Sequence, residues 1–168
     1  MPTLYILRGA PGTGKTSLAA ELHKTLRCPW FEFGWIPEFR NLNPHTEISY
    51  EDEVALSTEN LILVSKNYFA HGYETVIVSD LEDERLPAFA DAFHDIADVR
   101  ILTLDCDDET RTNRILTRDN GNEYRDTEAA AEIAEKIRRT PYTDERRIDS
   151  GNMTTEDLCK SVLLAQNR

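Results

Sequence analysis

The sequence predicts an α/β protein built on one parallel sheet with helices on both of its faces. Short β-rich runs alternate with longer helical stretches along the 168 residues, a length that fits one domain. Residues 75–79 form a continuously apolar, β-branched run, as in a strand that is covered on both sides. A glycine-rich turn lies between the first β-rich run, at 4–7, and the first helical stretch, at 15–26. Together these features indicate a single α/β domain over 1–168.

The order of the expected elements follows from periodicity and from turn residues. The first helix carries Leu18, Ala19, Leu22 and Leu26 at helical spacing, and Gly72 provides a natural end for a long helix before it. Asp157 stands three residues after Thr154, as in a capping box. The expected strands are 4–7, 30–33, 75–79, 100–104 and 145–148. The expected helices are 15–26, 50–71, 86–97, 109–117, 127–138 and one that begins near 154.

Charge and composition exclude several functional classes. The chain has 19 Lys and Arg against 31 Asp and Glu, a formal charge of −12, which argues against a duplex nucleic-acid binder or an anionic-membrane binder. No apolar run approaches the ~20 residues of a membrane span, and we expect no signal peptide. Cys28, Cys106 and Cys159 have no zinc or disulfide spacing, so we expect reduced thiols and a cytoplasmic location.

Residues 9–16, with the sequence GAPGTGKT, match the phosphate-binding pattern G-x-x-x-x-G-K-[ST]. Glycines let successive backbone N–H groups point inward toward an anion, and the helix that follows adds its positive end. Lys15 would place a charge on the β- and γ-phosphates, and the Thr16 hydroxyl would bind Mg²⁺. The alternative is a glycine-rich turn that only caps a helix. The expected nucleotide-binding residues of this segment are Gly9, Ala10, Pro11, Gly12, Thr13, Gly14, Lys15, Thr16 and Ser17.

Asp80 directly follows the apolar strand at 75–79. A carboxylate in this position can hold Mg²⁺ directly or through water, so we interpret Asp80 as catalytic and metal-binding. The alternative is an ordinary aspartate that caps the next helix.

Arg111, Arg114 and Arg118 are spaced at i, i+3 and i+7, which places them on one face of a helix. Guanidinium groups match phosphate oxygens, and a mobile lid that carries them would close over a triphosphate and exclude water. We expect Arg114 and Arg118 to be catalytic, and Arg111 to stack on the base of the nucleotide. The alternative is a solvated face that pairs with the acids Asp107, Asp108 and Glu109.

An aromatic cluster at 30–40 comprises Trp30, Phe31, Phe33, Trp35 and Phe39. Phe31 and Phe33 share one face of the expected strand, so we expect both in the core. Trp35 and Phe39 fall beyond the strand, where they would either line an acceptor pocket or pack in the core. Glu38 is the nearest carboxylate that would take a proton from an acceptor hydroxyl.

Four segments together resemble the small-molecule P-loop kinases, a group with shikimate kinase, gluconate kinase, adenylate-type kinases and chloramphenicol phosphotransferase. These segments are 9–16, 68–80, 111–118 and 147–163. The run PWFEFG at 29–34 is similar to the second-strand region of chloramphenicol phosphotransferase.

The resemblance implies the three-layer P-loop NTPase fold, with sheet order 2-3-1-4-5 and a helical lid over about 109–140. It also implies Mg-ATP as the donor and a loop at 150–153 that borders the adenine, with Asn152 as a nucleotide-binding residue. Members of the group usually carry an aspartate just after the second strand that acts as a base. Here Trp35, Ile36 and Pro37 follow that strand, and Glu38 is the first carboxylate after it.

The favoured function is an ATP-dependent phosphotransferase that acts on a small hydroxylated or phosphorylated metabolite, with ATP and Mg²⁺ as cofactors. The missing aspartate favours an alternative, a nucleotide-binding regulatory protein with little catalysis. A nucleic-acid end kinase is a further alternative, which the charge of −12 disfavours. We expect a monomer or a homodimer, and no membrane partner.

Overall fold

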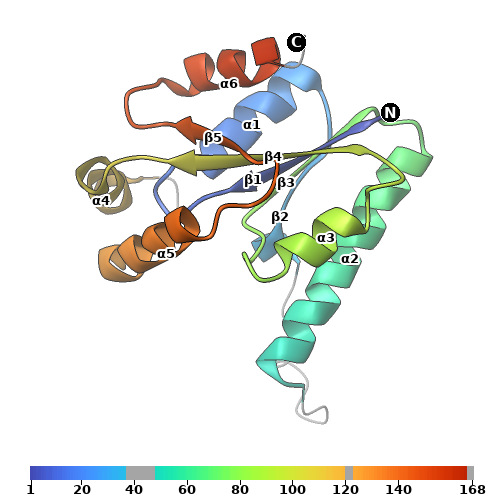
Figure 1. Ribbon diagram of the computed structural model, residues 1–168, viewed down its shortest axis with the longest axis horizontal. Coiled ribbons are helices and arrows are strands. Elements are labelled where there is room, and N and C mark those ends of the chain that lie inside the picture. The colour runs from blue at the N-terminus through green and yellow to red at the C-terminus, as the bar shows by residue number, and fades with distance from the viewer. Residues whose placement is uncertain (37–47, 120–122, 166–168) are drawn as a thin grey trace.

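The sheet of the protein has five strands, all parallel, in the order β2-β3-β1-β4-β5 (Figure 1). The structure is a computed structural model that describes residues 1–36, 48–119 and 123–165. This strand order confirms the one that the sequence resemblance implies. The strands are β1 (Thr3–Arg8), β2 (Trp30–Glu32), β3 (Thr75–Ser79), β4 (Asp98–Asp105) and β5 (Arg146–Asp149).

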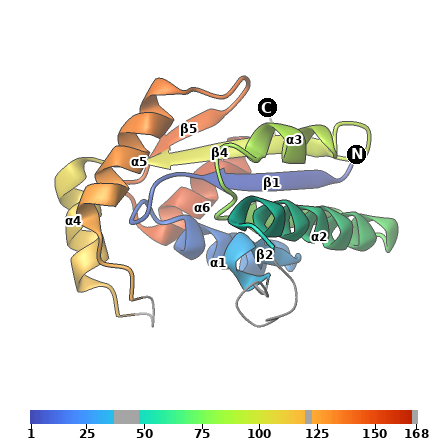
Figure 2. The ribbon, with the colours of Figure 1, turned by 90° about the horizontal axis from the view of Figure 1, so that it is seen from below.

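Helices cover both faces of the sheet and complete a three-layer α/β fold. Helices α1 and α6 lie on one face, and α2, α3 and α5 lie on the other (Figures 1 and 2). The arrowheads of β4 and β5 point toward α4, which lies at the edge where these strands end (Figure 1). The helices are α1 (Lys15–Leu26), α2 (Tyr50–Ala70), α3 (Leu86–Asp91), α4 (Asp108–Thr117), α5 (Thr127–Arg139) and α6 (Thr155–Leu164), with a 3₁₀ turn η1 (Phe33–Trp35).

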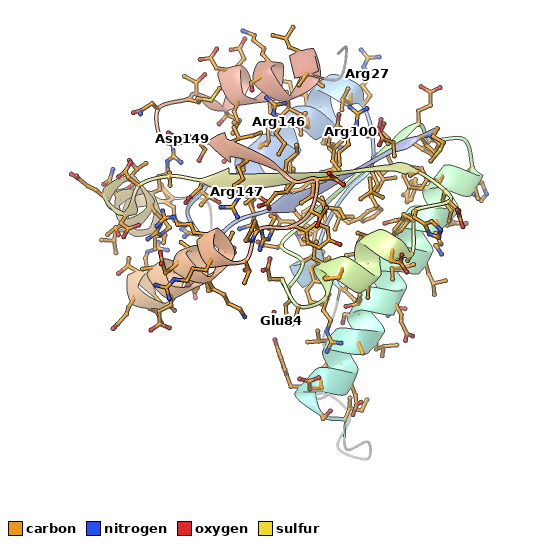
Figure 3. All side chains as sticks on the ribbon, viewed as in Figure 1. Arg27, Glu84, Arg100, Arg146, Arg147 and Asp149 are labelled. Carbon is orange, nitrogen blue, oxygen red and sulfur yellow. The ribbon has the colours of Figure 1, made fainter. Side chains whose placement is uncertain are left out.

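Two hydrophobic cores lie on the two sides of the sheet, because successive side chains of a strand point to opposite faces. In β1, Tyr5 and Leu7 face the core under α1 and α6, whereas Leu4 and Ile6 face the core under α2 and α3. Two neighbouring residues of β5 show the same alternation. Arg146 reaches Ser161 of α6 and Arg147 reaches the Ile137 carbonyl of α5, so the two labelled side chains leave the strand on opposite sides (Figure 3).

Side-chain caps fix the starts of four helices. The hydroxyl or carboxylate oxygens of Ser49, Asp107, Asp126 and Thr154 accept backbone N–H groups in the first turns of α2, α4, α5 and α6. At α6 the Asp157 amide donates to the Thr154 Oγ1 atom over 3.1 Å, which confirms the capping contact expected there. These caps therefore fix the residue at which each loop ends and its helix begins.

Two elements are shorter than the sequence predicts. The helix expected over 86–97 ends at Asp91, and turns follow it in which Phe93 fills the core beside Phe89. The strand expected over 30–33 ends at Glu32, because the chain turns at Phe33 into η1, where the Ile36 amide donates to the Phe33 carbonyl. In both places the chain passes into turns while Phe93 and Phe33 still pack in or against the core under α2 and α3.

Within the described ranges, no helix combines the length and the apolar character needed to cross a bilayer.

Candidate functional site

A cleft of about 610 Å³ opens at the carboxyl ends of the strands, where ligands bind in parallel α/β sheets. The phosphate-binding segment forms its floor, and α4 and the loop after β5 form its sides. It is lined by Pro11, Gly12, Thr13, Gly14, Lys15, Thr16, Ser17, Glu32, Asp80, Arg114, Thr117, Arg118, Tyr124, Ser150, Met153, Thr155 and Leu158.

The segment from Gly9 to Gly14 forms a tight loop that leads directly into α1. Gly12 and Gly14 have φ values of 86° and 97°, a region that favours glycine. The Thr13 amide and hydroxyl both donate to the Ala10 carbonyl, over 3.3 and 2.8 Å. Gly9 and Ala10 lie beneath the cleft instead of lining it, since a Cβ atom at Gly9 would lie 2.6 Å from the Leu104 carbonyl oxygen. These two residues therefore shape the loop, and residues 11–17 face the cleft.

Lys15 is held by the oxygens of its own loop and by Asp80. Its ammonium group donates to the Gly9 carbonyl over 2.8 Å and to the Ala10 carbonyl over 3.2 Å. It also lies 3.1 Å from the Asp80 carboxylate. The side chain is mostly buried, yet it lines the cleft. The charge of Lys15 is thus fixed at the point where the loop would enclose an anion.

Asp80 reaches this position through an unusual backbone conformation. Its φ value is 62°, in the left-handed region that residues other than glycine seldom adopt. β3 ends at the preceding residue, so the turn at Asp80 directs its carboxylate to Lys15. Such conformations are enriched at functional sites. The structure therefore brings together two residues that are 65 positions apart in the sequence and that both belong to the predicted site.

Glu32 is a site residue that sequence reasoning missed. It ends β2 and accepts the Thr16 hydroxyl proton over 2.7 Å. A threonine hydroxyl has one proton and two lone pairs, so this bond leaves the lone pairs of Thr16 for a cation. The signal in the sequence that could have revealed this role is that Glu32 is the one carboxylate within the aromatic run at 30–33. β2 and β3 pair with Glu32 beside Ser79, so Glu32 and Asp80 belong to the same edge of the sheet.

The oxygens of Thr16, Glu32 and Asp80 suit a hard cation such as Mg²⁺. In the described part of the chain, no group of three or more His, Cys, Asp or Glu side chains is arranged to hold a metal ion. A magnesium ion at this place would therefore need further oxygen ligands from phosphate groups or water.

Arg114 and Arg118 line the cleft from α4 and from the residue that follows it. The Arg114 guanidinium donates to the carbonyl oxygens of Ser150 and Gly151, over 2.8 and 3.3 Å, and so lies beside the loop after β5. The Arg118 guanidinium lies 5.9 Å from the centre of the Tyr124 ring, and its buried Nη2 atom has no hydrogen-bond partner among the described residues. Burial lowers the pKa of Arg118, but a guanidinium remains charged at neutral pH.

Arg111 lies outside the cleft, against the expectation that it stacks on a base. It is only 1 % exposed, and its Nη2 atom donates to Asp108 over 2.9 Å. Its side chain packs against the phosphate-binding loop at Gly12, where a Cβ atom would lie 2.9 Å from Arg111 Cγ. The spacing of the three arginines predicts that they share one helical face. Arg111, however, lies where α4 packs against the phosphate-binding loop. In this conformation no base can reach it.

The loop after β5 borders the cleft, although not through the expected residue. Asn152 is exposed and does not line the cleft, whereas Ser150 and Met153 do. The Ser150 hydroxyl donates to the Thr13 carbonyl over 2.7 Å and so joins this loop to the phosphate-binding loop. Met153 and Leu158 add apolar surface that would suit the face of a base. Ser150 and Met153 belong to the loop at 150–153 that the resemblance placed beside the adenine, whereas no sequence pattern singled out Leu158 as a cleft residue.

The aromatic cluster lies beside the cleft. Phe31 and Phe33 pack against the core under α2 and α3, as expected. Trp35 is 54 % exposed, and the centre of its ring lies 4.8 Å from that of Trp30, whose Nε1 atom donates to the Ser79 hydroxyl over 3.0 Å. Glu38 and Phe39, which the sequence nominated as a base and a pocket residue, lie outside the described residues.

No curated protein matches the sequence. A sugar kinase from Janibacter sp. aligns with a TM-score of 0.69 at 17 % identity and covers 99 % of this chain and 95 % of its own. The tunicamycin resistance protein of Deinococcus radiodurans also has a TM-score of 0.69 at 17 % identity, over 98 % and 95 % of the two chains. Shikimate kinase from Bacteroides thetaiotaomicron has a TM-score of 0.66 at 16 % identity, over the full length of both.

Because the sequence identities are low, these structural likenesses establish the fold alone. The family model described as an AAA domain matches residues 6–136, which include the phosphate-binding loop, Asp80 and the arginines of α4. The chain therefore belongs to the AAA domain family and has the fold of the small-molecule P-loop kinases.

Proposed function

We propose that this protein is an ATP-dependent phosphotransferase that moves the γ-phosphoryl group of Mg-ATP to a hydroxyl group of a small metabolite. The observation that carries the proposal is that Lys15, Thr16, Glu32, Asp80 and Arg118 line one cleft at the carboxyl ends of the strands. Phosphoryl transfer depends mainly on positioning and on neutralising charge, and this set supplies cations and metal-binding oxygens for both.

The donor would be held by the loop that Gly12 and Gly14 shape. Backbone N–H groups at the start of α1 and the Lys15 ammonium group would bind the phosphates, once Lys15 exchanges the Gly9 and Ala10 carbonyls for phosphate oxygens. Thr16 and Asp80 would hold magnesium, with Glu32 orienting the Thr16 hydroxyl. The ion would neutralise charge on the β- and γ-phosphates.

The two cleft arginines would have different roles in the lid over 109–140. Arg114 lies against the Ser150 and Gly151 carbonyls, so it would border the base or the α-phosphate. Arg118 is the better candidate for the transferred phosphoryl group, because its buried Nη2 atom has no partner among the described residues. A phosphate oxygen would satisfy this donor. The predicted catalytic role of Arg114 is therefore supported less than that of Arg118.

The acceptor would enter beside β2 and η1, near Trp35. Positions 33–36 carry no carboxylate, so Glu38 remains the predicted base for the acceptor hydroxyl. The same observation favours a second candidate function, a nucleotide-binding regulatory protein with little turnover.

ADP release from Mg-ATP, measured over a panel of acceptors, tests the proposal. The panel contains neutral sugars, sugar acids, amino sugars, nucleosides and a 5′-hydroxyl oligonucleotide, which represents the end-kinase alternative. We expect at least one small acceptor to raise ADP release above the acceptor-free rate. Tight nucleotide binding with no acceptor effect would instead identify a regulatory protein.

An Arg118→Met variant makes the test specific. We expect turnover to fall about 10³-fold with little loss of nucleotide affinity, because the charge acts on the transferred group. Arg139→Met is the matched control, since Arg139 is exposed and pairs only with Glu135 in the described contacts. Equal losses in the two variants would contradict the role of Arg118.

A further inference from the structure

The short connection between β3 and α3, residues 80–85, carries Asp80 and is tied to three other parts of the fold. Besides Asp80, which meets Lys15 of α1, its charged residues each contact a different side chain of β1, α2 or α5. The pairs are Glu82 with Tyr50, Asp83 with Arg8, Glu84 with Lys136, and Arg85 with Glu51.

The pair of Arg8 and Asp83 is the least exposed of these pairs. The guanidinium donates through Nε and Nη2 to the two Asp83 carboxylate oxygens, over 2.5 and 2.7 Å. Nη1 donates to Glu145 over 2.7 Å, and Nη2 also reaches the Thr140 carbonyl over 2.8 Å. The Arg8 side chain is 3 % exposed, and the hydrogen bond with Asp83 is the largest cause of its raised pKa. A two-pronged bond of this kind fixes orientation as well as distance.

The other pairs of the connection restrain it less. Glu84 and Lys136 are 61 % and 58 % exposed, and Glu84 lies at the surface (Figure 3). Glu51, the partner of Arg85, is also largely exposed. Exposed ion pairs contribute little to stability because water screens them. Among the charged contacts of residues 82–85, the Arg8–Asp83 pair therefore restrains the connection most, while Leu81 adds a packing contact with the core under α2 and α3.

This pair joins the two halves of the site. Arg8 ends β1 and directly precedes Gly9, the first residue of the phosphate-binding loop. Asp83 lies three residues after Asp80, whose backbone has a φ value of 62° and whose side chain is half exposed. A residue in that strained conformation keeps its place only if its surroundings hold it. The Arg8–Asp83 contact supplies such support on the side of the connection away from β3.

We propose that Arg8 and Asp83 are positioning residues that hold the Asp80 carboxylate in register with Lys15 and Thr16, and so set the affinity of the site for magnesium. This inference rests on the proposed function, in which Asp80 holds the ion. Neither residue lines the cleft, so neither would touch a nucleotide bound there. Their effect on a magnesium ion would be transmitted through the backbone of residues 80–83.

The test compares the affinity for a fluorescent ATP analogue, methylanthraniloyl-ATP, in Mg²⁺ and in EDTA. The ratio of the two affinities is the magnesium enhancement. We expect Asp83→Asn to reduce this ratio about tenfold while the affinity in EDTA stays within about twofold, as for supporting residues around a metal site. Asp80→Asn is the positive control and should abolish the enhancement.

The matched control is Glu84→Gln, the same change of acid to amide one residue further along the chain. It should leave the ratio unchanged, because Glu84 belongs to an exposed pair. Arg8→Lys provides a second variant if Asp83→Asn does not fold. It keeps the charge but loses the two-pronged bond, so the ratio should fall in the same direction.

The outcomes separate this inference from the proposed function. An unchanged ratio in folded Asp83→Asn or Arg8→Lys protein overturns the positioning role. Equal losses of affinity in Mg²⁺ and in EDTA overturn it as well, since they indicate a structural role only. Wild-type protein that binds no analogue would refute the nucleotide site itself. Binding without any magnesium enhancement would refute the metal role of Asp80 and the positioning role together.

Discussion

At the scale of single residues, Lys15 has the most consequential contacts of the site. Its ammonium group donates to two carbonyls of its own loop and meets the Asp80 carboxylate. Removing it would leave these oxygens without their cation and would take one of the positive charges of the cleft away from a bound phosphate.

We therefore predict that Lys15→Met weakens ATP binding by about 10–100-fold, the effect of losing a charge-assisted hydrogen bond of about 1.5–3 kcal/mol. Titration with methylanthraniloyl-ATP measures this loss. Lys24→Met is the control, because Lys24 is an exposed lysine of the same helix. Similar losses in both variants would show that Lys15 acts only through the general charge of the protein.

At the scale of elements, the packing of α4 against the phosphate-binding loop depends on Gly12. A Cβ atom there would lie 2.9 Å from the Arg111 carbonyl oxygen and 2.9 Å from Ile115 Cγ1. The loop and the helix can approach so closely only because this position has no side chain.

We predict that Gly12→Ala lowers the free energy of unfolding by about 2 kcal/mol or more, since the φ of 86° is strained for alanine and α4 must also move. Gly34→Ala should change it by less than about 0.5 kcal/mol, because no atom lies within 4 Å of a Cβ atom there. Urea unfolding of both variants measures the difference. An unchanged free energy of unfolding in Gly12→Ala would contradict this prediction, because it would show that the loop and α4 can move apart at little cost.

The sequence predicted those parts of the fold and the site that depend on local pattern. The motif at 9–16 and the apolar strand that ends before Asp80 are contiguous signals, and parallel strands bring both to one edge of the sheet. The strand order came from the resemblance to a family, because periodicity gives no neighbour relations between strands.

The parts that were missed depend on contacts between distant segments. Glu32 reaches Thr16 only through the pairing of β2 with β3, and local pattern does not reveal that register. Arg111 shares a helical spacing with Arg118, but spacing does not say which of them meets the loop. The expected helix at 86–97 ends at Asp91, because the spacing of Phe89 and Phe93, which both lie in the core, does not show where the helix gives way to turns.

At the scale of the whole molecule, the buried thiols link stability to alkaline pH. Burial raises the pKa of Cys28 from 9.0 to about 11, and it also raises the pKa of Cys106 and of Cys159. All three thiols are free and buried. Below about pH 9 they are protonated in both the folded and the unfolded chain, so they add no pH dependence there.

Between about pH 9 and pH 11 the unfolded chain releases thiol protons that the folded chain retains. We therefore predict that the free energy of unfolding falls as the pH rises through this window, which urea unfolding at about pH 8 and about pH 10 would measure. Cys28→Ala should reduce the fall. An identical fall in that variant would assign the effect to other groups, such as Tyr5, whose pKa burial also raises.

The contacts between Lys15 and the carbonyl oxygens of its own loop have a consequence for ligand selection. Three oxygens already surround the Lys15 ammonium group, so an incoming anion must replace several contacts at once. A single inorganic phosphate ion has fewer oxygens with which to contact both the Lys15 ammonium group and the backbone amides of the loop. A chain of linked phosphates can do both, so the site should discriminate by the length of the polyphosphate before it discriminates by the base.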